Sequence, residues 1–241
     1  GGPYSDGFRT DVEKPARVDH PVPVPVRAAR YRTHRAVRDR RPEHLRRRLR
    51  RNLPPTRAEA AQMFYNLLLD KDVKKTITFT DVKGDEWYAD AVYAMATLGV
   101  LKGYPDGTFQ PDRAITRAEF TTMGMQFSHL DTSEENLFKD VSSSDWFHSF
   151  VVGASKYGWI SGYPDGTFKP NDNVTRAEVT CLVNNMLGRS ADESFVDRNS
   201  AKLNSFTDLT KSYWAYYPIM EAANGHDWRA NNGAEIWTKL L

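Results

Sequence analysis

The sequence predicts a mainly α-helical protein in which three tandem helix–loop–helix repeats form a pseudo-threefold helical bundle. Two observations lead to this prediction. A set of short motifs recurs at a spacing of 59 residues, as from Asp81 to Asp140 and from Gly103 to Gly162. Apolar side chains also follow each copy of Thr-Arg-Ala-Glu at helical intervals, so each copy has a face that needs a partner.

Each repeat opens with Phe-x-Asp-Val or Phe-x-Asp-Leu, and a tryptophan follows shortly after the aspartate. The aspartate and tryptophan pairs are Asp81 and Trp87, Asp140 and Trp146, and Asp208 and Trp214. A helix is expected after each of the first two tryptophans, over residues 88–98 and 147–157. Gly99 and Gly158 stand at the ends of these helices, where a residue in the left-handed conformation commonly terminates a helix.

A tight turn is predicted in the Gly-Tyr-Pro-Asp-Gly segments at 103–107 and 162–166. Proline presets φ for the second position of a β-turn, which puts the last glycine at the fourth position. The Thr-Arg-Ala-Glu sequences that begin at Thr56, Thr116 and Thr175 then predict helix starts. Threonine and the glutamate three residues later form a capping box, because each side chain can bind the other residue's backbone N–H.

Apolar residues mark one face of each helix that follows Thr-Arg-Ala-Glu. The faces consist of Ala61, Phe64, Tyr65, Leu68 and Leu69 in the first copy, Phe120, Met123 and Phe127 in the second, and Val179, Leu182, Val183, Met186 and Leu187 in the third. One helix pair cannot bury such a face alone, so we expect the copies to pack together. With three copies, a closed pseudo-threefold bundle is the compact arrangement.

The first 52 residues differ from the rest in composition. They hold Lys14 and 14 arginines against 6 acids, or 15 − 6 = +9, so the remaining 18 bases and 25 acids give −7. The run at 18–26 ends in alternating proline and valine, which favours polyproline II. Residues 27–51 hold 12 arginines and few large apolar groups, so we expect little packed structure there. One hypothesis is a frame-shifted reading of an ordinary first repeat, which an independently confirmed reading frame would refute.

These patterns divide the chain into five segments. They are an atypical basic segment at 1–52, disordered or frame-shifted, the remnant of a first repeat at 53–78, a second repeat at 79–137, a third repeat region with a linker at 138–205, and a truncated or divergent terminal repeat at 206–241. The terminal segment keeps Phe206, Asp208 and Trp214 but has neither the turn nor Thr-Arg-Ala-Glu.

Catalytic, cofactor and metal sites are not expected. Cys181 is the single cysteine and has no evident histidine partner on its apolar helix, so we expect a buried, inert thiol. The aspartates near the turns, Asp106, Asp112, Asp165 and Asp172, do not supply the alternating oxygen ligands of a calcium loop. The six histidines show no paired zinc spacing, and no glycosidase carboxylate pair stands out. No window approaches the roughly 18 apolar residues of a membrane span.

Phe-x-Asp-Val…Trp, Gly-Tyr-Pro-Asp-Gly-Thr-Phe and Thr-Arg-Ala-Glu, in this order and at this spacing, resemble the S-layer homology (SLH) domain over residues 54–241. The resemblance implies three tandem repeats in a pseudo-trimer around a central helical bundle. It also implies non-catalytic anchoring of a bacterial surface protein to secondary cell-wall polysaccharide, often pyruvylated, in grooves between adjacent repeats. The protein would then be secreted and located at the bacterial cell wall or S-layer surface, with other surface-layer subunits as further partners.

The resemblance assigns glycan contacts to the arginine of Thr-Arg-Ala-Glu, the aspartate and tryptophan of the first motif, and the first turn glycine. These residues are Arg57, Asp81, Trp87, Gly103, Arg117, Asp140, Trp146, Gly162, Arg176, Asp208 and Trp214. A guanidinium can bind a pyruvate carboxylate through two parallel hydrogen bonds, and a helix start adds a favourable dipole. The groove between residues 79–130 and 138–189 has the most complete set, and we expect Arg117, Asp140 and Trp146 to act there.

Each assignment has a structural alternative. Arg117 and Arg176 can pair with acids of a neighbouring repeat, and the tryptophans can lie in the core between helices. The aspartates can cap the turn that follows or neutralise the arginine. Another function is open to residues 27–51, which can bind nucleic acid or another polyanion with an affinity that falls steeply with salt. The acidic remainder of the chain and the lack of aromatic residues beyond Tyr31 argue against nucleic acid. A third possibility is an enzyme whose catalytic part lies outside this chain.

Overall fold

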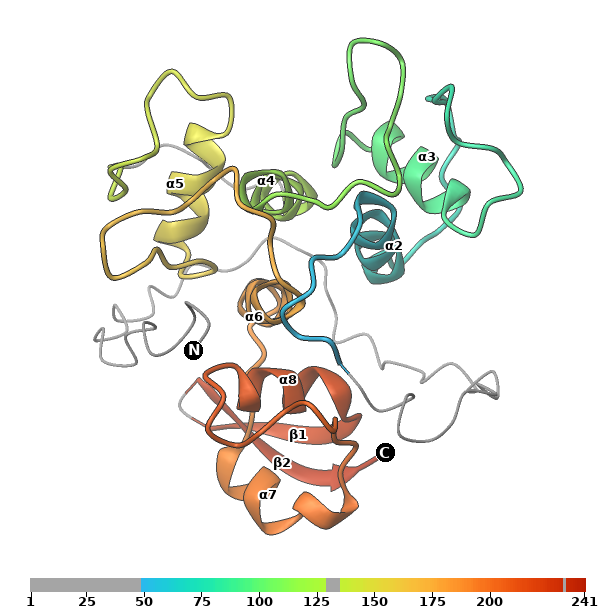
Figure 1. The fold of residues 1–241 in the computed structure, drawn as a ribbon. Coiled ribbons are helices and arrows are strands. Elements are labelled where there is room, and N and C mark those ends of the chain that lie inside the picture. Colours follow the sequence, from blue (N-terminus) through green and yellow to red (C-terminus); the bar gives the residue numbers. More distant parts are fainter. Residues whose placement is uncertain (1–48, 129–134, 232) are drawn as a thin grey trace. The chain divides into compact units, whose positions relative to one another are not determined.

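A computed structural model describes residues 49–128, 135–231 and 233–241 (Figure 1). These residues form two compact units. The first unit contains residues 54–128 and 135–174, and the second contains residues 49–53, 175–231 and 233–241. The described residues form seven α-helices and one two-stranded sheet, so the prediction of a mainly α-helical protein is confirmed. Within these ranges, no helix has both the length and the apolar character that crossing a membrane requires.

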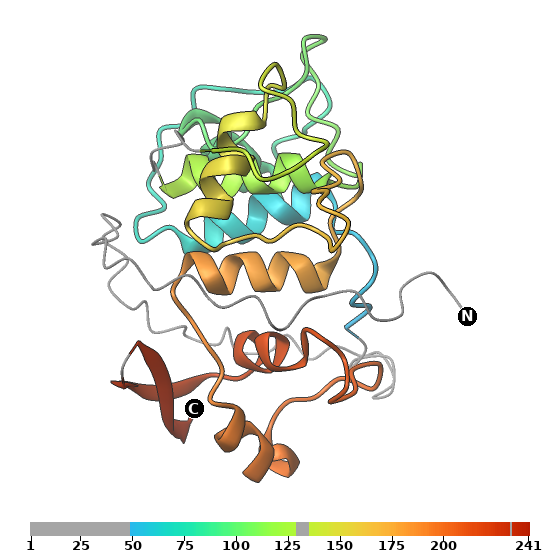
Figure 2. The ribbon, with the colours of Figure 1, turned by 90° about the vertical axis from the view of Figure 1, so that its left-hand side faces the viewer.

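The first unit consists of two helix pairs. Helices α2 (Arg57–Leu67) and α3 (Ala89–Thr97) pack together, as do α4 (Arg117–Ser128) and α5 (His148–Lys156). Helices α2 and α4 lie side by side in both views (Figures 1 and 2). Phe64 of α2 contacts Phe120 and Phe127 of α4, each with ring centroids 5.4 Å apart. The aromatic members of the predicted apolar faces therefore meet in the core of this unit.

The second unit contains a third helix pair, in which α6 (Arg176–Met186) packs against α8 (Tyr216–Ala223). Between them in sequence come α7 (Glu193–Arg198) and a short 3₁₀ helix, Ser200–Lys202. The chain ends in an antiparallel hairpin of β1 (His226–Asn231) and β2 (Ala234–Leu240). The register pairs His226 with Leu240 and Asn231 with Ala234, with an irregularity at Asp227 and Trp228. The hairpin takes the place of the missing turn and helix, and it was not predicted from the sequence.

The capping boxes predicted at the three Thr-Arg-Ala-Glu sequences are confirmed. In each box the threonine hydroxyl accepts the glutamate N–H at 3.2 Å, and the glutamate carboxylate accepts the threonine N–H. The three pairs are Thr56 with Glu59, Thr116 with Glu119, and Thr175 with Glu178. Helices α3 and α5 lie one residue inside the predicted ranges at each end. Gly99 and Gly158 follow them with φ of 75° and 68°, the left-handed conformation predicted for these positions.

The two predicted turns are also confirmed. The Gly107 N–H donates to the Tyr104 carbonyl at 3.0 Å, and the Gly166 N–H donates to the Tyr163 carbonyl at 2.9 Å. The aspartate inside each turn, Asp106 or Asp165, accepts hydrogen bonds from the backbone N–H and the hydroxyl of the threonine two residues later. These bonds hold the pKa of both aspartates below its usual value.

Candidate carbohydrate-binding site

The aspartate of each Phe-x-Asp motif holds a loop by its backbone. Its two carboxylate oxygens accept the N–H groups of two consecutive residues at distances between 2.7 and 2.9 Å. The contacts join Asp81 to Phe109 and Gln110, Asp140 to Phe168 and Lys169, and Asp208 to Leu49 and Arg50. We call this arrangement the carboxylate clamp. It is the loop-capping role that the sequence left open as an alternative to sugar binding.

The second residue of each clamped pair has the same unusual backbone conformation. Its φ is 58° at Gln110, 57° at Lys169 and 55° at Arg50. Arg50 belongs to the atypical basic segment, of which residues 1–48 lie outside the described residues. Within the second unit, Leu49 and Arg50 therefore have the backbone role that Phe109 and Gln110 have in the first.

A loop carbonyl accepts the N–H of the arginine at each Thr-Arg-Ala-Glu helix start. The bonds run from Arg57 to Arg113, from Arg117 to Asp172 and from Arg176 to Leu53, at 2.9, 2.9 and 3.2 Å. These carbonyls belong to the loops that the carboxylate clamps hold. Each clamp therefore fixes a loop that accepts a hydrogen bond from the helix start of another motif copy.

The Arg57 side chain makes several internal contacts and is only 6% exposed. Its guanidinium donates to the Phe109 and Lys102 carbonyls, both at 2.9 Å, and to Glu119 at 3.1 Å. It also lies over the ring of Tyr104, 5.0 Å from the centroid. These hydrogen bonds use three of the five N–H groups that a guanidinium carries. Burial lowers the pKa of Arg57, although the neighbouring Glu119 works to raise it.

Arg117 repeats this environment in the next repeat. It is also 6% exposed, and its Nε donates to the Phe168 carbonyl at 2.8 Å. Its guanidinium lies over the rings of Tyr163 and Phe168, at 4.9 and 4.6 Å from the centroids. Arg176 is half-buried. Both Arg57 and Arg117 therefore help to hold the Gly-Tyr-Pro-Asp-Gly loops in place.

The first turn glycines pack against the phenylalanine of the Phe-x-Asp motif. A Cβ at Gly103 would lie 2.3 Å from Cε1 of Phe79 and 2.7 Å from the Thr108 carbonyl oxygen. A Cβ at Gly162 would lie 2.7 Å from Cε1 of Phe138 and equally close to the next loop carbonyl. Both positions therefore require glycine for packing, whatever else they contact.

The motif tryptophans lie at the surface. Trp87 and Trp146 are each 62% exposed, and Trp214 is 37% exposed. Trp87 and Trp146 each meet the next aromatic residue edge-on, with centroids 5.2 and 5.3 Å apart. This contact steadies the indole, most of which stays exposed to solvent. Trp87 and Trp146 therefore do not lie in the core between helices, which was the structural alternative for these residues.

A pocket of about 320 Å³ in the first unit brings together residues from three motif copies. Its lining includes Arg57 at the start of α2, Gly103 in the turn after α3, and Trp146 before α5. Arg117, Asp140 and Gly162 do not line it, so the structure groups Trp146 with Arg57 rather than with Arg117. We call this space the Arg57 pocket.

The Arg57 pocket has further lining residues that were not predicted from the sequence. Tyr104, Glu119 and Phe150 are among them, and Lys102 adds a second base. Tyr104 and Glu119 belong to the recurring motifs, so their recurrence was an available signal. Burial works to raise the pKa of Glu119, but the Thr116 N–H and the charges of Arg57 and Arg113 hold it below its usual value. The acid at the pocket wall is therefore an ion already paired with arginine.

Taken together, the clamped loops, the capped helix starts and the exposed tryptophans define a tandem-repeat module with a pocket lined by residues of several motif copies. The family model of the S-layer homology domain matches residues 78–121 and 137–180. These two segments are therefore S-layer homology domains in tandem, and the resemblance seen in the sequence is confirmed.

Three relatives show how widely this segment occurs. The chain is 36% identical to cell surface glycoprotein 1 of Acetivibrio thermocellus over 200 residues, which is 77% of this chain and 8% of the relative. It is 36% identical to the cellulosome-anchoring protein of the same organism over 197 residues, 77% of this chain and 42% of the relative. It is 36% identical to an amylopullulanase of Thermoanaerobacterium thermosulfurigenes over 149 residues, 58% of this chain and 8% of the relative. The chain thus spans less than half the length of each.

Proposed function

We propose that this chain is a non-catalytic anchor that attaches a bacterial surface protein to the cell wall by binding secondary cell-wall polysaccharide, with a pyruvylated sugar as ligand. The Arg57 pocket carries the proposal, because it joins an arginine, a turn glycine and an exposed tryptophan from different repeats. The names of two relatives, a cell surface glycoprotein and an anchoring protein, support a cell-surface location.

The chemistry of the Arg57 pocket suits an anionic sugar. The exposed Trp146 offers an apolar face on which a sugar ring can stack. The internal hydrogen bonds of Arg57 leave one N–H on each terminal nitrogen, and such a pair can bind one carboxylate. Lys102 adds positive charge at the same wall, while Glu119 is neutralised by its arginine partners.

The range of proteins in which the shared segment occurs supports a non-catalytic role. Relatives with different names, one an anchoring protein and one an amylopullulanase, share it with this chain. It covers only 8% of the amylopullulanase. We infer that the segment supplies attachment and that enzymatic activity, where present, resides elsewhere in such proteins.

The pseudo-threefold bundle of three repeats is part of the same proposal. One helix pair recurs as α2 with α3, α4 with α5, and α6 with α8. The carboxylate clamp also recurs three times, at Asp81, Asp140 and Asp208. These recurrences support the repeat boundaries drawn from the sequence, and further grooves would then use Trp87, Arg117, Arg176 and Trp214.

The test is a sedimentation assay on purified cell-wall sacculi, with and without their secondary polymer. We expect binding only when the polymer is present. Trp146→Ala should weaken binding by about tenfold, the effect of losing roughly 1.4 kcal/mol. Trp228→Ala is the matched control, because Trp228 is an exposed tryptophan of β1 outside the pocket. Binding to polymer-free sacculi, or equal binding by the Trp146 variant, would contradict the proposal.

The polyanion alternative needs a separate measurement. It rests on residues 27–51, and within the described part of that segment the Leu49 and Arg50 backbone is held by Asp208. A chain that lacks residues 1–48 keeps this clamp. Full binding of that shortened chain to sacculi supports the anchor, whereas loss of binding supports the polyanion alternative.

A further inference from the structure

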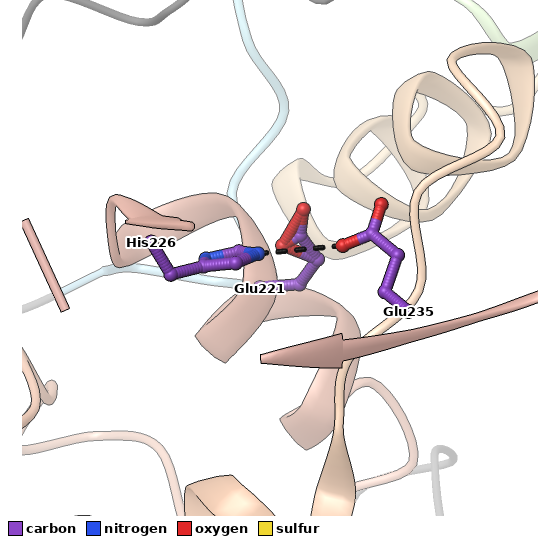
Figure 3. Close-up of side chains that lie close together, drawn as sticks. All are labelled: Glu221, His226 and Glu235. Carbon is purple, nitrogen blue, oxygen red and sulfur yellow. Dashed lines mark hydrogen bonds and ion pairs between the residues drawn. The ribbon is translucent and has the colours of Figure 1, made fainter. Parts of the chain in front are cut away.

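A buried polar cluster lies in the second unit, where α8 meets the hairpin. Glu221 comes from α8, His226 begins β1 and Glu235 lies in β2, and Figure 3 shows their side chains converging. The three residues are 5%, 8% and 4% exposed. One potential ligand atom from each lies within 4.8 Å of the other two. None of these residues takes part in the Arg57 pocket.

Arg189 is the cation of this cluster. Its Nε donates to Glu235 at 2.5 Å, and one terminal nitrogen lies 3.0 Å from a Glu221 oxygen. The same nitrogen lies 3.0 Å from Nε2 of His226, which is 3.3 Å from Glu235. Arg189 therefore occupies the space toward which the three side chains point. Its own side chain is 23% exposed, so it has a path to solvent.

One oxygen of Glu221 lacks a partner. Among the described residues, Oε2 of Glu221 is buried and has no hydrogen bond. Burying an unpaired carboxylate oxygen is costly, and burial accordingly raises the pKa of Glu221 above its usual value despite the nearby Arg189. This oxygen is an unused ligand atom inside the cluster.

The carboxylates of the cluster outnumber its guanidinium. Two carboxylates and one guanidinium sum to −1, and an uncompensated buried charge is strongly unfavourable. Nδ1 of His226 lies 2.7 Å from the Asn224 carbonyl, which can only accept, so Nδ1 carries the proton. When Nδ1 carries the only ring proton, Nε2 is an acceptor whose lone pair lies beside the glutamates. This carbonyl contact, which fixes the tautomer, is the arrangement that metal-binding histidines commonly use.

The imidazole of His226 is also held in place. The ring of Trp237 stacks on it with centroids 3.6 Å apart and an interplanar angle of 16°. The Trp237 N–H donates its backbone hydrogen bond to Asp192 at 3.2 Å, which ties β2 to the N-terminal end of α7. Nε2 therefore keeps its direction without help from Arg189.

We propose that Glu221, His226 and Glu235 bind a divalent transition-metal ion of the zinc class. Two carboxylate oxygens and one imidazole nitrogen are ligands that Zn²⁺ accepts at about 2.0–2.2 Å, whereas Ca²⁺ and Mg²⁺ prefer oxygen ligands alone. When the metal is absent, Arg189 forms ion pairs with both glutamates. When the metal binds, Arg189 turns outward toward Trp228. The site links α8 to both strands, so the ion stabilises the second unit.

The test uses the full-length chain, freed of metal with a chelator and dialysed. Calorimetric titration with ZnCl₂ at pH 7.5 should show one tight site per chain, and matched titrations with CaCl₂ and MgCl₂ should not. Glu221→Gln and His226→Gln should each weaken zinc binding by more than about tenfold. His148→Gln is the control, because His148 begins α5 outside the cluster. Zinc should raise the melting temperature of the parent chain but not that of the cluster variants.

Arg189→Gln separates a metal site from an ion-pair network. If the cluster binds metal, removing the competing cation tightens zinc binding, and zinc restores the melting temperature that the variant loses. The visible spectrum of Co²⁺ substituted for zinc in the parent chain gives a second readout that needs no variant. The proposal is overturned if zinc neither binds nor shifts melting, if the Glu221 and His226 variants bind as tightly as the parent, or if zinc leaves Arg189→Gln unaffected.

Discussion

Replacing Gly103 with alanine adds a methyl group where two neighbours leave no room. The new Cβ would lie 2.3 Å from Cε1 of Phe79 and 2.7 Å from the Thr108 carbonyl oxygen. Phe79 is half-buried and can turn, but the oxygen belongs to the backbone and accepts the Tyr104 N–H at 2.8 Å. The turn must therefore open for alanine to fit. We expect this change to destabilise the first unit.

The size of the effect follows from two opposing terms. Overpacking costs about 1–3 kcal/mol, and alanine recovers about 0.4–1 kcal/mol by restricting the unfolded chain. Since the clash includes a backbone atom, the larger penalties apply, and the net loss in unfolding free energy is about 2 kcal/mol. For a chain of this size, that loss lowers the melting temperature by about 4–8 °C.

Thermal unfolding followed by circular dichroism measures this loss directly. Gly84→Ala is the matched control, because no atom lies within 4 Å of a Cβ there and its φ is not left-handed. It should melt at or slightly above the parent temperature. Equal melting of the Gly103 and Gly84 variants would refute the packing argument. If the Gly103 variant kept its stability and lost binding to sacculi, the glycine would instead contact the glycan.

Four further outcomes are expected. Asp140→Ala leaves two loop N–H groups without their acceptor and should lower the unfolding free energy in urea by about 1–3 kcal/mol, with a smaller loss in Asp140→Asn; no loss in either variant would refute the clamp. Thr116→Ala should cost about 1 kcal/mol while Thr116→Ser stays near the parent, because serine can also cap; equal losses would argue against the capping box. Burial raises the pKa of Cys181 to about 12, so the native thiol should react slowly with an aromatic disulfide at pH 8 and rapidly in urea, and its contribution to stability should fall as the pH rises from about 9 toward 12. Because the pKa of Glu221 is raised, the parent loses stability as the pH rises through that pKa. Metal-free Glu221→Gln should therefore have a higher melting temperature than the parent at pH 7.5 but not at pH 4. The reverse order would contradict the argument that the buried charge of Glu221 is unfavourable.

The helix starts, helix ends and turns could be predicted because they depend on neighbours in sequence. A capping box needs only a threonine and a glutamate three residues apart, as at Thr116 and Glu119. The turn at 103–107 needs only its proline and glycine in the right positions. The folded structure therefore keeps the conformations that these local preferences favour.

The composition of the Arg57 pocket could not be predicted in this way. Arg57 and Trp146 are far apart in the sequence, and their meeting depends on how α2, α4 and α5 pack. Spacing along the chain suggested Arg117 as the partner of Trp146, but the Arg117 guanidinium lies against Phe168. The exposure of Trp146 likewise depends on packing rather than on its motif.

The hairpin and the polar cluster were missed for different reasons. The hairpin had a local signal, the Asn-Gly pair at 232–233 followed by the strand-forming residues Ile236, Trp237 and Thr238. The cluster had none, because Glu221, His226 and Glu235 meet only after the hairpin folds back on α8. The charge that completes it comes from Arg189, which follows α6 and is distant from all three residues in sequence.

A carboxylate clamp binds main-chain N–H groups and is therefore indifferent to side chains. Phe-Gln, Phe-Lys and Leu-Arg all satisfy it, provided that the second residue tolerates a φ near 55° to 58°. The segment before residue 53 can thus lack all the motif residues and still supply the two backbone N–H groups that Asp208 accepts. The clamp can therefore form in a repeat whose sequence no longer shows the family motifs. Here Leu49 and Arg50, from the atypical basic segment, complete the clamp of Asp208.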